Sequence, residues 1–246
     1  AIMNPNMSYS KFDFVLLPEH DRTPQNVKEK NPNIIETIGS LNRIQDQKIK
    51  DEAEKWREEI SKLPAPYISF IIGGDTKSAK IDPNEFEGIC KKLSDLVKSL
   101  NGSLLITTSR RTSQACIEKL KENITCSSYL YDWADENSKK PEDKNPLGNP
   151  YFAYMGLADF IVVTGESMSM ISESCSTGKP VYVYKPTGLL AEKHDTFCKS
   201  LKKYGFIKIF DKETKSLEKF EYQPLKEVER IYDILARKMD IDLQYK

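Results

Sequence analysis

The sequence predicts an α/β fold built on a doubly wound parallel sheet. Three observations predict it: short apolar runs alternate with amphipathic segments, several runs such as SFII and FIVV are apolar on both faces, and turn residues separate them. Strands that are apolar on both faces are typical of parallel sheets covered by helices on each side. Alternation of strands and helices is typical of doubly wound folds.

The composition limits the possible classes of function. The 246 residues contain 37 Lys and Arg against 37 Asp and Glu, so the formal net charge is zero. This balance argues against duplex nucleic acid or an anionic membrane as the main partner, because both require a basic excess. No apolar run approaches the roughly 20 residues of a transmembrane helix. Five scattered cysteines and two histidines favour neither a disulfide framework nor a metal site. We therefore expect a cytoplasmic protein without a metal or other cofactor.

The first 63 residues begin with an apolar strand at 12–17, followed by a polar loop at 19–33. Apolar residues spaced by three and four then predict a helix at 46–63. Pro64 and Pro66 end that helix and mark the predicted domain boundary.

Beyond this boundary, strands and helices alternate to the end of the chain. Expected strands lie at 67–72, 103–107, 127–131, 159–164, 180–184 and 206–210. Expected helices lie at 82–100, 112–122, 150–157, 167–177, 189–204 and 224–239. Residues 132–149 are expected to form a polar loop. Ligands of doubly wound sheets bind beyond the carboxyl ends of the strands, so the loops that follow strands are the candidate sites.

The first candidate loop contains Gly73, Gly74, Asp75 and Thr76, followed by Lys77. Glycines let a backbone approach a ligand closely. The loop matches neither the P-loop pattern nor GxGxxG, so a nicotinamide cofactor has no support. The alternative is a tight turn with the lysine in solvent.

The second candidate loop carries Arg110 and Arg111 at the start of a helix. Cations at this position oppose the helix dipole, so helix stability does not explain them. An anionic ligand would, because the guanidinium group offers a planar fork of donors to phosphate. The alternative is that each arginine pairs with a nearby carboxylate.

The third candidate loop leaves its strand at Gly165 and starts a helix at Ser167, Met168 and Ser169. The free N–H groups of a helix start bind phosphate readily. Further along this helix, the carboxylate of Glu173 is placed to accept bonds from vicinal ribose hydroxyls. The alternative is an ordinary serine-capped helix with a solvated glutamate.

Weaker candidates complete the set. His20 and Asp21 follow the first strand and offer an imidazole and a carboxylate for general base work, although a solvated loop is an equal alternative. His194 lies in a charged stretch and is expected at the surface. Asp132 and Trp133 would suit stacking of a base, with a half-buried tryptophan as the alternative.

These motifs resemble one known family. GGDTK at 73–77, SLLITTSRRT at 103–112 and the long segment from Asn149 to Tyr184 are similar to the Elongated-Mitochondria (mitochondrial fission) proteins. PEHDR at 18–22 and the spacing of Phe197, Leu201 and Gly205 fit as well. The resemblance covers essentially the whole chain. It implies a GT-B glycosyltransferase-like fold, with residues 1–63 as part of an N-terminal Rossmann-like domain, 64–223 as a nucleotide-sugar-binding domain and 224–246 as a helix returning to the first part.

The segment from 172 to 180 is also similar to the nucleotide-sugar helix of GT-B enzymes such as the lipid II N-acetylglucosaminyltransferase. That similarity implies ribose binding by Glu173 and diphosphate binding by Ser167, Met168 and Ser169. Ser167 departs from the pattern, because those transferases usually carry glycine there. Family members also begin with a full N-terminal domain, whereas this sequence starts partway through it, so a missing N-terminal part is expected.

Three functions follow as expectations. In the first, the protein is a glycosyltransferase that uses a nucleoside-diphosphate sugar, with Arg110 or Arg111 stabilising the leaving diphosphate and His20 or Asp21 as the base. In the second, it is a nucleotide-sugar epimerase or hydrolase on the same fold, which requires an acid/base pair. In the third, it is a non-catalytic adaptor, as the role of the plant family members in organelle fission suggests.

Overall fold

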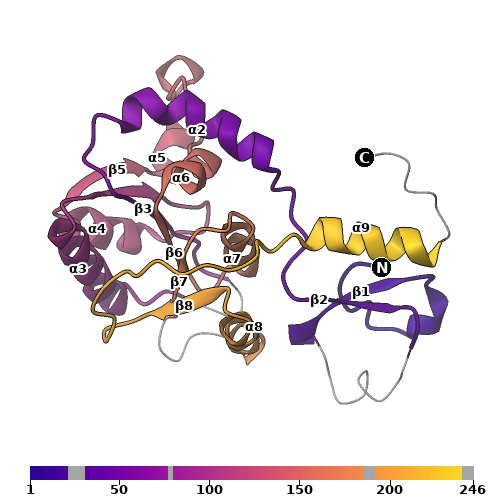
Figure 1. Ribbon diagram of the computed structural model, residues 1–246. Coiled ribbons are helices and arrows are strands. Elements are labelled where there is room, and N and C mark those ends of the chain that lie inside the picture. Colours follow the sequence, from indigo (N-terminus) through magenta and orange to yellow (C-terminus); the bar gives the residue numbers. More distant parts are fainter. Residues whose placement is uncertain (22–30, 77–79, 186–191, 240–246) are drawn as a thin grey trace.

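The structure is a computed structural model that describes residues 1–21, 31–76, 80–185 and 192–239. Its larger part contains a six-stranded parallel sheet in the order β5-β4-β3-β6-β7-β8 (Figure 1). The strands are β3 (Tyr67–Ile71), β4 (Ser103–Thr107), β5 (Ser127–Tyr131), β6 (Phe160–Thr164), β7 (Val181–Tyr184) and β8 (Ile207–Phe210). The chain runs outward from β3 to one edge and then from β6 to the other. The predicted doubly wound α/β fold is thereby confirmed, and the strand order reverses between β3 and β6.

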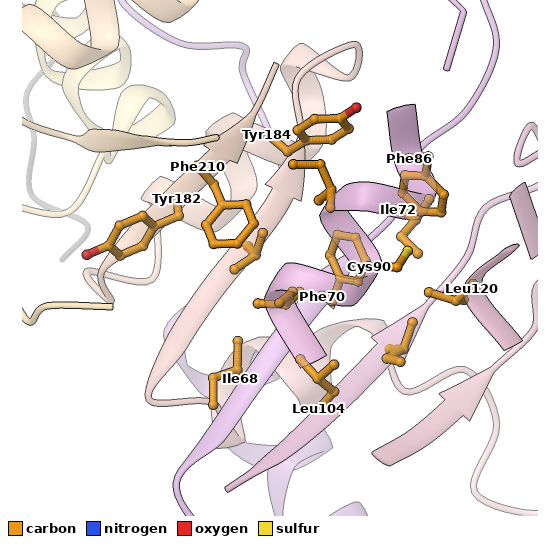
Figure 2. Packing of buried hydrophobic residues seen from close by; sticks show 14 of the residues in the cluster. Ile68, Phe70, Ile72, Phe86, Cys90, Leu104, Leu120, Tyr182, Tyr184 and Phe210 are labelled. Atoms are coloured by element: carbon orange, nitrogen blue, oxygen red, sulfur yellow. The ribbon is translucent and has the colours of Figure 1, made fainter. Parts of the chain in front are cut away.

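One face of this sheet is covered by α3 (Pro83–Ser99) and α4 (Gln114–Asn123). Figure 2 shows Phe70 of β3 packed near Phe86 and Cys90 of α3, with Tyr184 and Phe210 from the far strands in the same cluster. The start of α3 agrees with the sequence prediction, because the Asp82 side chain accepts a hydrogen bond from the Asn84 amide at 2.8 Å.

The opposite face is covered by α2 (Asp46–Ile60), α6 (Tyr151–Leu157), α7 (Met168–Cys175) and α8 (Glu192–Lys203). Residues 189–191 of the helix expected at 189–204 lie outside the described residues. Gly156 of α6 permits close packing of α2, since a Cβ there would lie 2.9 Å from Ala53 Cβ. Trp56 of α2 is fully buried beside Tyr154 of α6. The predicted boundary at 63/64 stays a prediction, but this packing favours a division between β2 and α2.

The smaller part is a two-stranded parallel sheet of β1 (Val15–Pro18) and β2 (Ile34–Thr37). The last helix, α9 (Glu227–Lys238), packs on it through Ile231, which contacts Leu16 and Ile35 (Figure 1). Two short 3-10 helices, η1 (Tyr9–Lys11) and η2 (Glu19–Asp21), flank β1. The sequence prediction did not include β2, whose four residues IIET are too few to show a period.

The stretch expected to be a polar loop at 132–149 contains α5 (Trp133–Ser138) and the 3-10 helix η3 (Pro141–Asp143). This expectation was wrong for residues 133–138. Asp132 caps α5 by accepting from the amides of Ala134 and Asp135 at 3.2 and 3.4 Å. The helix is too short and too polar for an apolar period to reveal it.

Candidate functional site

A cavity of about 390 Å³ lies between the small sheet and the carboxyl-terminal ends of β3 and β6. From the smaller part it is lined by Ile2, Met3, Leu16, Pro18, His20, Thr37, Gly39, Ser40 and Leu41. From the larger part it is lined by Thr76, Arg111, Glu166, Ser167, Met168, Ser169, Lys193 and His194. Because the strand order reverses between β3 and β6, this cavity occupies the position at which doubly wound sheets bind their ligands.

The glycine loop after β3 uses its glycines to approach a carboxylate. The Gly74 amide donates to Glu166 Oε1 at 2.7 Å, and the Gly73 amide donates to Thr164 Oγ1 at 2.8 Å. A Cβ on Gly73 would lie 2.0 Å from Glu166 Oε1, so only glycine fits. Thr76 lines the cavity, whereas Gly73, Gly74 and Asp75 stand behind it. Lys77 lies outside the described residues.

The two arginines of the second loop differ in their position relative to the cavity. Both are exposed, but Arg111 lines the cavity and Arg110 does not. The hydroxyl of Ser109 donates to the Gly73 carbonyl at 2.5 Å, and the hydroxyl of Thr112 donates to the same oxygen. These bonds fix the turn against the glycine loop.

The third loop brings the start of α7 to the cavity. Ser167, Met168 and Ser169 all line it, whereas Gly165 does not, and their role as a ligand loop stays a prediction. The Ser167 side chain makes no capping bond, and the helical bonds begin with the Ile171 amide donating to the Ser167 carbonyl at 3.1 Å. The leading N–H groups of α7 therefore face the cavity without a side-chain cap, which is the arrangement that favours an anion.

Positive charge adds to this helix start. Arg111 comes from the β4 side and Lys193 from α8, and both line the cavity. Lys193 Nζ also pairs with Asp21 at 2.5 Å. Asp21 therefore meets the cavity only through this lysine, whereas its neighbour His20 lines the cavity directly.

His194 lies in the cavity wall, so the expectation that it would be a surface residue was wrong. It is only 7% exposed. The charged residues beside it hid a helical period in which His194, Phe197, Cys198 and Leu201 all point inward. That period was the signal in the sequence that identifies His194 as buried.

Glu166 is a further titratable cavity residue to which the sequence analysis gave no role. It is 2% exposed, and burial raises the pKa of its carboxyl against the opposing effects of its hydrogen bonds and of Arg111. Burial also lowers the pKa of His194 and lowers the pKa of His20 to about 4. The cavity thus combines a buried carboxyl group with two imidazoles that are neutral at pH 7.

Glu173 lies outside the cavity lining and accepts a hydrogen bond from the hydroxyl of Tyr151 on α6. Burial raises the pKa of its carboxyl, while Tyr151 and Lys48 lower it. Trp133 is half-buried and packs beside the cluster of Trp56 and Tyr154, as in the alternative reading of that residue.

The described ranges contain neither a membrane-spanning helix nor a candidate metal site. No helix in 1–21, 31–76, 80–185 or 192–239 is long and apolar enough to cross a membrane. In the same ranges, no three His, Cys, Asp or Glu side chains are grouped in a way that could hold a metal ion.

Comparison with known proteins identifies the class of this protein. The family model described as "Mitochondrial fission ELM1" matches residues 1–239, so the chain belongs to the mitochondrial fission ELM1 family. It is 28% identical to the uncharacterized protein RP120 of Rickettsia prowazekii, over 98% of this chain and 73% of that one. It is also 28% identical to the mitochondrial fission protein ELM1 of Arabidopsis thaliana, over 91% of this chain. The match spans only 54% of the plant protein.

Solved structures give weaker likenesses. A UDP-GlcNAc 2-epimerase from Neisseria meningitidis, bound to UDP-GlcNAc, matches with a TM-score of 0.46 and 15% identity over 92% of this chain and 62% of the enzyme. The glycotransferase of kitacinnamycin matches with a TM-score of 0.42 and 16% identity, over 94% of this chain and 47% of that one. A family 9 glycosyl transferase from Veillonella parvula matches with a TM-score of 0.39 and 11% identity, over 77% of this chain and 46% of that one. All three TM-scores are under 0.5, so no conclusion about function is drawn from these structures.

Proposed function

We propose that this protein is a GT-B-like protein whose cavity binds a nucleoside-diphosphate sugar. In this proposal it transfers the sugar to an acceptor, as a glycosyltransferase does. The observation that carries the proposal is the uncapped start of α7, which faces the cavity together with Arg111 and Lys193 at the point where the strand order reverses. A volume of about 390 Å³ is within the range of small-molecule sites.

The roles divide along the cavity. Ser167, Met168 and Ser169 supply backbone N–H groups to the diphosphate, and Arg111 neutralises the charge that develops when the diphosphate leaves. His20 is the candidate base, because its lowered pKa keeps the imidazole neutral and able to accept a proton. Asp21 holds Lys193 beside it.

Several earlier expectations stay predictions. Glu173 as a ribose ligand requires that the nucleoside reach the α6–α7 contact, and Arg110 as a phosphate ligand requires its exposed side chain to turn inward. A cytoplasmic location belongs to the same group. The match spans about half the length of the plant relative. Any activity that requires the rest of such a longer protein is therefore also a proposal.

One alternative has an observation in its favour. An epimerase or hydrolase of nucleotide sugars needs an acid/base pair, and the buried Glu166 and the two histidines line one cavity. The adaptor function, in contrast, predicts that no nucleotide sugar binds.

The proposal is tested by titration calorimetry with UDP-, GDP-, ADP- and CMP-linked sugars, using Arg111→Ala against Arg110→Ala. Loss of charge-assisted bonds to phosphate should weaken binding about 10- to 100-fold in the Arg111 variant. The Arg110 variant is the matched control and should bind within about twofold of the parent, since Arg110 does not line the cavity. Equal binding by both variants, or no binding of any nucleotide sugar to the parent, would contradict the proposal.

A further inference from the structure

Within the part of the chain that the structure describes, three buried polar atoms around the cavity have no hydrogen-bond partner. They are Glu166 Oε2, His194 Nδ1 and His20 Nδ1. All three belong to residues that line the same cavity. Buried polar atoms are nearly always hydrogen-bonded, so three unpartnered atoms around one cavity require an explanation. A ligand that brings its own polar groups is such an explanation.

The two oxygens of Glu166 differ in a way that supports this explanation. Oε1 has structural partners, because it accepts from the Gly74 amide at 2.7 Å and from the Thr164 hydroxyl at 2.8 Å. These bonds hold the carboxyl group rigidly at the ends of β3 and β6. The fold therefore fixes the position of Oε2 while giving it nothing to bind.

The histidines have the same property. The ring of His20 packs edge-on to Phe197, with ring centroids 5.0 Å apart, and its Nδ1 remains unpartnered. A neutral imidazole offers one donor and one acceptor nitrogen. Carboxyl and imidazole groups together match hydroxyl groups, which both donate and accept.

The residues around these atoms further restrict the chemical class of ligand that fits. Glu166 directly precedes Ser167, so the unpartnered carboxyl oxygen belongs to the same loop as the anion-binding start of α7. Leu16 and Pro18 add an apolar wall on the opposite side. A ligand that satisfies both regions carries a hydroxyl-rich group next to phosphate.

We propose that Glu166, His194 and His20 form a polyol-binding subsite that holds the sugar of the nucleoside-diphosphate sugar. This inference rests on the proposed function, which it extends from the diphosphate to the sugar. Glu166 and His194 act by hydrogen bonding to sugar hydroxyls, and His20 closes the subsite from the smaller part of the molecule.

The two histidines provide a direct test, because they are the only histidines of the chain and both line the cavity. Two-dimensional NMR of the imidazole nitrogens and protons reports on this site without any substitution. We compare UDP with UDP-glucose, GDP with GDP-mannose, and glucose 1-phosphate, a probe that contains no base. Both imidazole signals should move with the sugar-bearing member of a pair and with glucose 1-phosphate, and much less with the diphosphate alone.

A variant then separates the sugar from the diphosphate. Glu166→Gln should weaken binding of the nucleotide sugar about tenfold, while the affinity for the nucleoside diphosphate stays within about twofold. Glu136→Gln is the control, because Glu136 is also a buried carboxylate, 8% exposed, but lies outside this cavity.

The outcomes distinguish the two proposals. Equal loss for the diphosphate and its sugar in Glu166→Gln, or imidazole signals that do not distinguish them in the parent, would overturn the subsite while nucleotide binding stands. Response to glucose 1-phosphate without binding of any nucleoside diphosphate would uphold the subsite and overturn the proposed function. No response to any probe would overturn both.

Discussion

The imidazole of His20 illustrates how burial changes the pKa of a side chain in the cavity wall. Desolvation lowers its pKa from the ordinary 6.5 to about 4, with Lys193 and His194 acting in the same direction. Asp21 and Glu19 oppose this change but do not outweigh burial. The folded protein therefore keeps His20 neutral at a pH where the unfolded chain is already protonated.

This difference in pKa predicts how stability depends on pH. Between pH 6.5 and 4 the unfolded state binds the additional proton, so the free energy of unfolding should fall as the pH is lowered through this window. His20→Asn should remove part of this dependence, roughly 1–2 kcal/mol after allowance for the partial exposure of the ring. Urea unfolding at pH 6.5, 5.5 and 4.5 measures it. Parallel pH curves for parent and variant would show that the ring titrates normally.

The orientation of single side chains explains why the sequence predicts some residues of the cavity and not others. The rule that ligands bind after parallel strands selects loops that line the cavity, and Arg111 and the start of α7 are among their residues. It does not say which side chain of a loop turns inward, and Arg110 and Arg111 differ only through a turn fixed by Ser109 and Thr112. Glu166 was missed because its burial depends on the glycines of a distant loop.

At the scale of elements, α6 and α7 meet through a buried polar contact. Tyr151 donates its hydroxyl to the carboxylate of Glu173, and the pKa of Tyr151 is raised well above its ordinary value by burial and by this carboxylate. The sequence resemblance predicts that Glu173 binds ribose, whereas in the structure Glu173 Oε2 accepts a hydrogen bond from Tyr151 on the neighbouring helix. The two roles make different predictions.

We expect Glu173→Gln to leave nucleoside-diphosphate affinity within about twofold and to lower the free energy of unfolding by about 0.5–1.5 kcal/mol, the net worth of one hydrogen bond. Tyr151→Phe should destabilise similarly, because it removes the other partner. Calorimetry and thermal unfolding of the two variants test this. A tenfold loss of affinity in Glu173→Gln, with normal binding in Tyr151→Phe, would instead restore the ribose role.

The elements that the sequence predicted share a physical property. Strands β3, β4 and β6 are apolar at most positions because both faces are covered, and α3 shows a clear apolar stripe with a cap. In contrast, β2 is four residues long and α5 six, and neither is long enough for a period to stand out. β2 is fixed by its pairing with β1, and α5 by the local cap of Asp132.

At the scale of the whole molecule, two crossing segments join the small sheet to the larger one, and both run beside α7 (Figure 1). The Ser40 amide donates to Ser172 Oγ at 2.9 Å, and the Leu225 amide donates to the Cys175 carbonyl at 3.1 Å. Gly39 permits this crossing, because a Cβ there would lie 2.5 Å from Leu225 Cδ2. The helix whose start lines the cavity thus also contacts both crossing segments.

Glu227 secures the smaller part beyond this crossing. Its carboxylate is 2% exposed, accepts from the Ile38 amide at 3.3 Å and pairs with Arg230 at 2.8 Å. Arg230 Nη2 in turn donates to the Glu36 carbonyl at 2.5 Å. One buried carboxylate therefore joins the start of α9 to the end of β2.

Glu227→Ala should loosen this part selectively. It leaves the Ile38 amide and a partly exposed arginine without their acceptor, which costs about 2–3 kcal/mol. Hydrogen exchange of β1 and β2 amides should quicken by about 30- to 150-fold if they exchange by local opening, while β3, β4 and β6 keep their protection. Glu229→Ala, an exposed glutamate on the same helix, should change neither set. Equal acceleration in both sheets would show that the two parts open as one cooperative unit, and the cavity between them would then be lost only on global unfolding.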